Sequence, residues 1–176
     1  MAIIAGVVFA VLALILRLVP HSPNFVPVAA LALWAGAYLP KRWGMTVPLA
    51  VMLASDALIG FYDWRLMFVV YASFALAVFV GWWVRKNRSV ARVVVGSLVG
   101  SMFFFLATNF AVWAFSSWYP HNLAGLFETY AMGAPFFRNT VLGDLFYSGV
   151  LFGSYALIKA FAKCKAGSLD LNPRVG

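Results

Sequence analysis

The chain consists of long apolar runs separated by short polar breaks, and this pattern is typical of a membrane protein. The runs cover residues 2–19, 25–40, 44–60, 66–84, 93–116 and 140–162. A helix needs about 20 apolar residues to cross a bilayer, and most of these runs approach that length. Only 10% of the residues are charged, whereas about 25% are charged in soluble domains. A soluble globular protein and a disordered chain are therefore both excluded.

The apolar runs are predicted to be helices. Inside a bilayer each segment must satisfy its backbone hydrogen bonds, so only helices and closed barrels cross it. Barrel strands alternate in polarity, and runs such as Val93–Val95 and Phe103–Leu106 do not. We predict an all-α integral membrane protein with six transmembrane helices in one domain, residues 1–165, and a polar tail at 166–176. Pro48 is predicted to lie in the first turn of its span, where a missing N–H is tolerated.

The basic residues divide unequally between alternate breaks, and this predicts the orientation in the membrane. One set of breaks holds only Arg17, Arg65 and Arg138. The other set holds ten of the thirteen basic residues: Lys41, Arg42, Arg85, Lys86, Arg88, Arg92, Lys159, Lys163, Lys165 and Arg174. Lys and Arg collect on the cytoplasmic side of membranes, so both termini are predicted to be cytoplasmic. The net charge of +8 then indicates topology and contact with anionic lipid, and no nucleic-acid binding is predicted.

The first apolar run has an alternative interpretation as a cleaved signal peptide. Such a peptide begins with a basic region and ends at a small-residue cleavage site. The run has no basic start and no clear cleavage site before Pro20. Cleavage would also leave five spans and place the new N-terminus outside, so we interpret the run as the first span.

The sequence contains no recognisable catalytic or metal-binding signature. The motifs G-x-S-x-G, H-E-x-x-H and the Walker lysine motif are absent. The two histidines, His21 and His121, fall in different loops, and the single cysteine, Cys164, excludes a disulfide framework or a cysteine cluster. We therefore predict that the protein is not an enzyme and holds no cofactor and no metal.

Acidic residues concentrate in the outer half of the predicted topology. Four of the five lie there: Asp56, Asp63, Glu128 and Asp144. Asp56 lies near the C-terminal end of its span, where the helix dipole disfavours a carboxylate, so it needs a partner or an aqueous cavity. Asp144 lies about one turn into the last predicted span. Three roles remain open for Asp144: capping of the helix, contact with a ligand or ion, and an ion pair with Arg138.

Small and polar residues form three further patterns in the predicted spans. Ser101, Thr108 and Asn109 make a sparse polar stripe, which serves either hydrogen bonding between helices or the lining of a pocket. Gly96 and Gly100 form a GxxxG motif, which predicts close helix packing. A stripe of small residues near the N-terminus serves either internal packing or the docking of a partner: Ala2, Gly6 and Ala10.

The long outer segment 117–139 is predicted to be a lid with a short interfacial helix at 122–131. Apolar residues recur there at helical spacing: Leu123, Leu126, Phe127 and Tyr130. Asn122 is expected to cap the N-terminus of this helix. Gly133 and Pro135 are expected to end it.

Polar residues from different spans are predicted to line one outward-facing cavity beneath this lid. Four of them fall at a similar level: Asp56, Asn109, Asn139 and Asp144. Burying them separately would require four sets of partners, whereas one hydrated pocket satisfies them together. Aromatic and polar groups of the outer loops complete the predicted substrate site: His21, Asn24, Trp64, Phe136, Phe137 and Arg138. A mostly apolar pocket with a few convergent polar groups suits a small ligand, and aromatic walls suit a flat heterocycle.

Two stretches carry a family resemblance. They are Pro23–Leu39 (PNFVPVAALALWAGAYL), followed by Lys41 and Arg42, and Val47–Phe61 (VPLAVMLASDALIGF). Over roughly residues 17–162 the chain resembles a family of small bacterial transport proteins of unknown function. That family is similar to the substrate-binding S-components of energy-coupling factor (ECF) transporters.

The resemblance implies a function and a location. S-components have six helices with cytoplasmic termini and bind a vitamin or similar micronutrient in an outward-facing cavity closed by outer loops. They dock on an ATPase-containing module through small residues of the first helix, which match Ala2, Gly6 and Ala10, although Gly6 interrupts the usual alanine stripe. We therefore expect a multi-pass uptake protein of the bacterial inner membrane that captures a small vitamin or heterocyclic micronutrient. The alternative is a non-transporting structural or assembly subunit, because one fold serves several functions.

Overall fold

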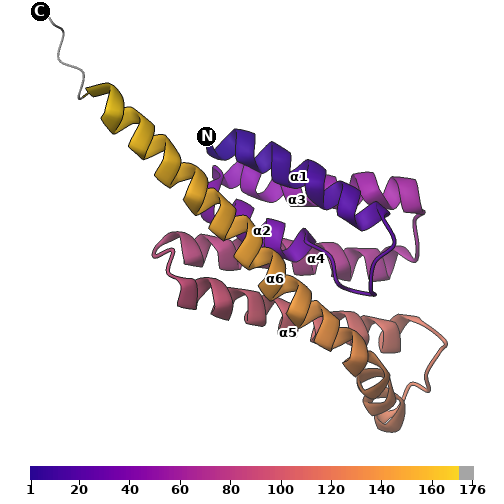
Figure 1. The fold of residues 1–176 in the computed structure, drawn as a ribbon. Coiled ribbons are helices and arrows are strands. Elements are labelled where there is room, and N and C mark those ends of the chain that lie inside the picture. The colour runs from indigo at the N-terminus through magenta and orange to yellow at the C-terminus, as the bar shows by residue number, and fades with distance from the viewer. Residues whose placement is uncertain (171–176) are drawn as a thin grey trace, which may run out of the picture.

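The structure is a computed structural model that describes residues 1–170, and all regular elements in that range are helices (Figure 1). They are α1 (Ala2–Leu18), α2 (Val28–Tyr38), α3 (Lys41–Ile59), α4 (Trp64–Arg85), α5 (Val90–Phe115) and α6 (Leu123–Asp170). The predicted all-α class is confirmed for this part of the chain. Three of the helices, α4, α5 and α6, are long and apolar enough to cross a membrane.

The connections between helices gather at two opposite ends of the bundle. The α1–α2, α3–α4 and α5–α6 loops lie at one end, which we call the loop end (Figure 1). The α2–α3 and α4–α5 connections lie at the other end, together with the N-terminus and the C-terminal part of α6. We call this the basic end, because it contains the larger basic set of the sequence; Arg174 of that set lies outside the described residues.

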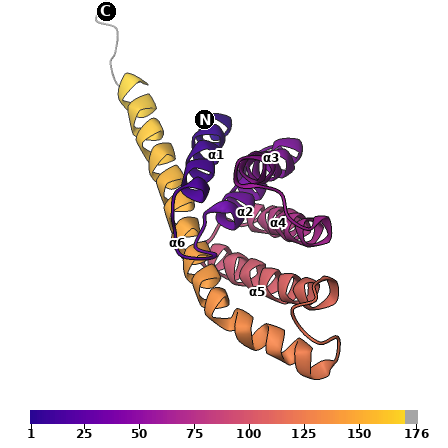
Figure 2. The same ribbon diagram turned by 90° about the vertical axis from the view of Figure 1, so that its right-hand side faces the viewer.

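The short helix α2 occupies the centre of the bundle, between α1, α3, α4 and α6 (Figure 2). Apart from Ala29, every residue from Val28 to Ala37 is buried, as expected for a helix that is apolar on all sides. Its 11 residues extend about 16 Å, whereas a bilayer core is about 30 Å thick. The predicted span at 25–40 is therefore corrected to a short internal helix.

Trp34 connects α2 to two of its neighbours. Its side chain is fully buried and makes edge-on ring contacts with Phe9 of α1 at 4.9 Å and with Tyr155 of α6 at 5.2 Å between ring centroids. Edge-to-face aromatic pairs stabilise beyond the area they bury. The small residues of α1 pack toward the same core: Ala2, Gly6 and Ala10. This is the internal-packing role for that stripe, and the docking role stays a prediction.

Two arginines of α4 and the following turn satisfy the C-terminal carbonyl groups of α2. Arg85 donates from Nε (3.1 Å) and Nη2 (2.6 Å) to the Gly36 oxygen, and it also donates to the Leu39 oxygen. Arg88 donates from Nε to the Ala37 oxygen at 3.2 Å. The last carbonyls of a helix have no partner within it, and cations favour that end. These two basic residues therefore stabilise a helix end that lies inside the protein.

A pair of glycines sets the close approach of α2 and α4. A Cβ atom on Gly81 would lie 2.4 Å from the Leu33 oxygen and 2.8 Å from the Cα atom of Gly36. The GxxxG motif of α5 is confirmed only in part, because a Cβ on Gly96 would lie 3.2 Å from Leu33 and Val80 side-chain atoms, whereas Gly100 has open space. The closest helix contact is therefore between α2 and α4.

The predicted lid helix is the first part of α6. Asn122 caps it as expected, because its Oδ1 accepts from the Gly125 backbone N–H at 2.9 Å. The helix does not end at Gly133 and Pro135 but continues through both into the last predicted span. A Cβ on Gly133 would lie 2.2 Å from Oδ1 of Asn109, so this part of α6 packs tightly against α5. This packing favours a continuous helix, although glycine and proline commonly end helices. Figure 2 shows a bend in this N-terminal part of α6, as proline produces.

Two other predicted boundaries are corrected. α3 begins at Lys41, so Pro48 lies inside the helix and not in its first turn. Gly44, four residues before it, leaves room where a proline ring crowds the preceding turn. α6 continues as a helix through Asp170, past the predicted start of the tail at residue 166. The remainder of the tail, 171–176, lies outside the described residues.

We predict that Gly81→Ala lowers the unfolding temperature of the purified protein by several degrees, since it forces α2 and α4 apart. Overpacking of this kind costs about 1–3 kcal/mol. Gly100→Ala is the matched control, because the same methyl group meets open space there. Thermal unfolding in detergent measures both, and equal effects of the two substitutions would contradict the assigned packing.

Candidate functional site

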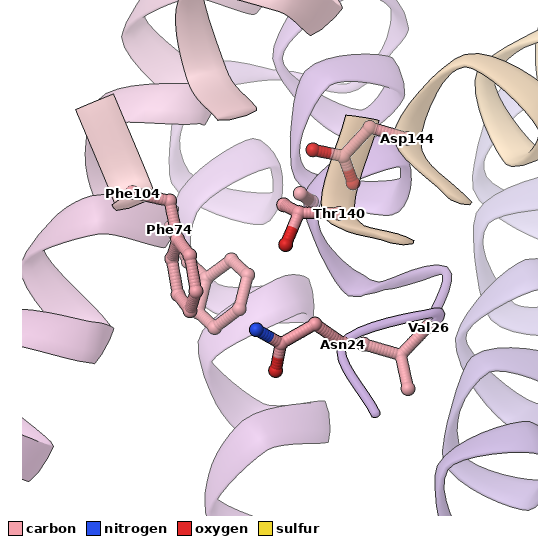
Figure 3. A pocket seen from close by; sticks show the side chains of 7 residues that line it. Asn24, Val26, Phe74, Phe104, Thr140 and Asp144 are labelled. Carbon is pink, nitrogen blue, oxygen red and sulfur yellow. The ribbon is translucent and has the colours of Figure 1, made fainter. Parts of the chain in front are cut away.

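A cavity made of three adjoining chambers lies at the loop end. Asn24 and Phe104 line all three, and we call the whole the Asn24 cavity. The Asp144 chamber measures about 30 Å³ and is lined by Asn24, Val26, Ala29, Phe74, Phe104, Thr140 and Asp144 (Figure 3). On its two sides lie the Asn109 chamber, of about 270 Å³, and the Arg17 chamber, of about 310 Å³. The cavity therefore brings together residues from all six helices and from the α1–α2 and α3–α4 loops.

The α1–α2 loop places Asn24 at the centre of this cavity. Asn24 has a φ angle of 61°, a left-handed conformation that Asn tolerates better than most residues. The Asn139 side-chain amide donates to the Pro23 carbonyl oxygen at 3.1 Å, and a Cβ on Gly143 would lie 3.2 Å from the Cα atom of Phe25. Two contacts with α6 therefore hold the loop, and the Asn24 amide group points into the cavity (Figure 3).

Asp144 forms the polar base of its chamber. Its side chain is only 4% exposed, and its Oδ2 accepts a 2.6 Å hydrogen bond from the Ser101 hydroxyl of α5. The capping role is corrected, because α6 begins at Leu123, far from Asp144. The ion pair with Arg138 is absent as well, since the ion pairs among the described residues are Arg17–Asp56 and Arg65–Asp63. The hydrogen bond to Ser101 joins α6 to α5, and contact with a ligand or ion stays a prediction.

The other buried carboxylate, Asp56, has its own cation. Arg17 of α1 donates from Nη2 to Oδ1 at 2.5 Å, and the Tyr71 hydroxyl of α4 donates to Oδ2 at 2.8 Å. The prediction that Asp56 faces protein is confirmed, since it is 1% exposed. These partners occupy both carboxylate oxygens of Asp56. Asp56 also lines none of the three chambers. Arg17, by contrast, does line one.

The loop between α3 and α4 contributes a phenol beside this ion pair. Tyr62 lines the Arg17 chamber. Partial burial, together with the nearby Asp56 carboxylate, raises the pKa of Tyr62 to about 12. Its hydroxyl therefore stays protonated at neutral pH and is a hydrogen-bond donor for a ligand in that chamber.

The polar stripe of α5 serves both of its predicted roles. Ser101 bonds across to α6, whereas Thr108 and Asn109 line the Asn109 chamber. Their side chains also bond the carbonyls of their own helix, Thr108 to Phe104 at 2.7 Å and Asn109 to Phe105 at 2.8 Å. The Asn109 amide thus has one donor hydrogen engaged by its own helix, and its Oδ1 packs close to Gly133 of α6.

The remaining predicted site residues divide into two groups. His21 lines the Arg17 chamber and Phe136 lines the Asn109 chamber. Four others line none of the three chambers: Trp64, Phe137, Arg138 and Asn139. Trp64 is 72% exposed, and Phe137 packs on Phe105 at 4.6 Å between ring centroids. The predicted set of Asp56, Asn109, Asn139 and Asp144 is thus corrected to Asn109 and Asp144, because the other two are satisfied by Arg17 and by the Pro23 carbonyl.

A second cavity of about 250 Å³ lies between α5 and α6 toward the basic end. Tyr38, Arg88, Ser97 and Ser148 are among its lining residues. The Ser97 hydroxyl donates to the Ser148 hydroxyl at 2.8 Å, and the Ser101 hydroxyl, which donates to Asp144 at 2.6 Å, lies 3.0 Å from the Ser97 carbonyl oxygen. A short seam of hydroxyl groups thus separates this basic-end cavity from the Asp144 chamber.

Comparison with protein-family models identifies the family of the chain. The model of a family of unknown function (DUF6580) matches residues 1–166. The chain belongs to this family. No curated protein and no solved structure matches it. Family membership therefore covers the entire bundle and assigns no activity to it.

Several residues of the cavity were not singled out by sequence reasoning. Phe74 and Phe104 lie in continuous apolar runs, where a cavity wall has the same composition as a lipid-facing surface. Tyr71 gives no local signal of its bond to Asp56. Of these residues, only Arg17 could have been identified from the sequence. A lone arginine on the same side as the outer acidic residues is a natural ion-pair partner for one of them.

We predict that Arg17→Met strongly destabilises the protein, because it leaves Asp56 buried without a cation. Loss of one partner of a buried ion pair costs about 3–5 kcal/mol. Adding Asp56→Asn to Arg17→Met should recover part of this loss. Arg65→Met is the control, since its partner Asp63 is exposed and surface pairs contribute about 0–1 kcal/mol. Chemical unfolding in micelles measures all four proteins, and a loss for Arg17→Met no larger than the control's would contradict the assignment.

Proposed function

We propose that the protein is a substrate-binding membrane uptake protein of S-component type, with a membrane-embedded bundle of six helices, of which α2 is short and internal, with cytoplasmic termini and with a location in the bacterial inner membrane. The observation that carries the proposal is the Asn24 cavity at the loop end. Its chambers are walled mainly by apolar side chains, and a few polar groups converge on them: Asn24, Asn109, Thr140 and Asp144. Small-molecule sites have this composition.

The ligand proposed for this cavity is a small vitamin or heterocyclic micronutrient with a flat ring. Phe74 and Phe104 lie with their ring centroids 5.6 Å apart, and both line the Asp144 and Arg17 chambers. Aromatic faces favour a planar ring. The two larger chambers, of about 270 and 310 Å³, approach the lower limit of about 300 Å³ for typical ligand pockets.

Release would follow a rearrangement of the bundle, driven by an ATPase-containing partner or without one. The basic-end cavity supports this view, because the short hydroxyl seam of Ser97, Ser101 and Ser148 separates it from the loop-end cavity. The small residues of α1 face the core. A partner module would therefore meet the opposite, apolar face of α1, which exposes Ile4, Val7 and Val11.

Native mass spectrometry of the purified full-length protein tests the proposal. A small molecule retained by the wild type supports uptake. A stoichiometric protein partner without a small molecule would instead identify a structural or assembly subunit. Absence of any bound molecule after gentle extraction would argue against a binding function.

We predict that Asn24→Gly reduces the amount of retained small molecule. Glycine keeps the left-handed backbone of this position and removes only the amide group. Losing one hydrogen bond between protein and ligand costs about 0.5–1.5 kcal/mol, which corresponds to roughly a two- to tenfold loss of affinity. Ser22→Gly, in the same loop, is the matched control. Equal retention by both variants and the wild type would remove Asn24 from the site.

The natural single cysteine allows the orientation to be tested. Cys164 is exposed at the basic end, so we predict that a membrane-impermeant maleimide labels it in inverted vesicles and not in intact cells. Ser117→Cys, made in a Cys164→Ser background, places the thiol at the loop end and should show the reverse pattern. Labelling of Cys164 in intact cells would overturn cytoplasmic termini.

A further inference from the structure

Among the described residues Asp144 is a buried carboxylate with no cationic partner. The residues around Asp144 on α2, α4 and α5 carry no charge. They are Ala29, Ala30 and Leu33 of α2, Ala77 of α4, and Gly96, Ser97, Gly100 and Ser101 of α5. The contrast with Asp56 is direct, because Asp56 is equally buried and binds Arg17 at 2.5 Å.

The hydrogen bonding of Asp144 leaves one oxygen for a ligand. Oδ2 accepts from Ser101 at 2.6 Å, and no described residue donates to Oδ1. The neighbouring hydroxyl of Thr140 is already engaged, since it donates to the Phe136 carbonyl at 2.9 Å. Figure 3 shows the carboxylate at the chamber wall, close to Thr140. A buried ionised carboxylate without a partner is strongly disfavoured, so Asp144 is either protonated or paired with a cation that the described residues do not supply.

The shape of the cavity indicates what carries that charge. The Asp144 chamber holds about 30 Å³, which is room for a group slightly larger than one water molecule, since a water needs about 10–15 Å³ by this measure. The chambers on either side are about ten times larger. A small head group therefore fits beside Asp144 while the body of the ligand occupies a wider chamber.

The walls of the narrow chamber also suit a cation. The aromatic rings of Phe74 and Phe104 line it together with Asp144 (Figure 3). Aromatic faces attract cations within about 6 Å of the ring centroid. Asn24 is a further polar residue of this chamber. The Asp144 carboxylate and the ring faces thus border a space in which no fixed cation is present among the described residues.

We propose that the ligand of the Asn24 cavity is an organic cation whose protonated nitrogen enters the Asp144 chamber and donates to the carboxylate. This inference rests on the proposed binding function and specifies the chemical class of the ligand. The ammonium group neutralises Asp144, and its ring or alkyl body packs against Phe74 and Phe104. Among residues 1–165 the protein supplies no cation for Asp144. The ligand nitrogen is therefore the positive partner of this carboxylate.

Three probes of nearly the same shape and different charge test this proposal: benzylamine, benzyl alcohol and benzoate. The purified full-length protein is unfolded thermally in detergent at pH 7 with increasing concentrations of each. Benzylamine is expected to raise the unfolding temperature in a saturable manner, with an apparent affinity at least tenfold higher than that of either other probe. Asp144→Asn should abolish this preference, whereas Glu128→Gln, an exposed acid of the same helix, should retain it.

The outcomes separate this proposal from the binding function on which it rests. If benzyl alcohol or benzoate stabilises the wild type as much as benzylamine or more, the proposal of a cationic ligand is wrong. The proposal that the cavity binds a small molecule is then unaffected. No effect of any probe on the wild type overturns both. Saturable stabilisation by NaCl over KCl, lost in Asp144→Asn, would assign Asp144 to an inorganic ion and overturn the organic one. The comparison among probes uses the wild type, so it holds even if Asp144→Asn fails to fold.

Discussion

The burial of nearly all of α2 is the constraint on which the rest of this structure depends. A helix of 11 residues inside a bundle leaves terminal carbonyl groups that need donors from other elements. Arg85 and Arg88 supply the missing donors, and Gly36 and Gly81 let α4 approach closely enough for this to happen. Two residues that at first indicate only membrane orientation thus have a structural role as well.

The shortness of α2 also creates the candidate site. Because α2 begins only at Val28, the chain between α1 and α2 forms a loop over the middle of the loop end, and this loop carries Asn24. α6 holds the loop through Asn139 and through the close approach at Gly143. The cavity therefore lies in the space that a full-length second span would have filled.

Two buried carboxylates show how the same residue type takes different roles in one bundle. Asp56 accepts from Arg17 and Tyr71 and connects α1, α3 and α4. Asp144 accepts from a single serine and faces a cavity. A satisfied ion pair contributes to structure, whereas a buried acid without a cation among the described residues is a candidate functional group, and we propose that a ligand completes this site.

The sequence by itself determined the helical class, the approximate positions of the helices and the cap at Asn122, because hydrophobic run length and capping residues act locally. It also placed Asp56 inside the protein and identified Asp144, Asn109, His21, Asn24 and Phe136 as candidates near one end. Only the tertiary structure decided that α2 is short and internal, that α6 continues through Gly133 and Pro135, and that Arg17 belongs to Asp56. Each of these depends on groups far apart in the chain. Arg85 and Arg88 satisfy carbonyl groups of α2, and Asn109 packs against Gly133. Arg17 pairs with Asp56, which lies 39 positions away. Local patterns contain no information about such partners, so the division between the ion-paired acid, Asp56, and the cavity-lining acid, Asp144, emerged only when the helices were packed together.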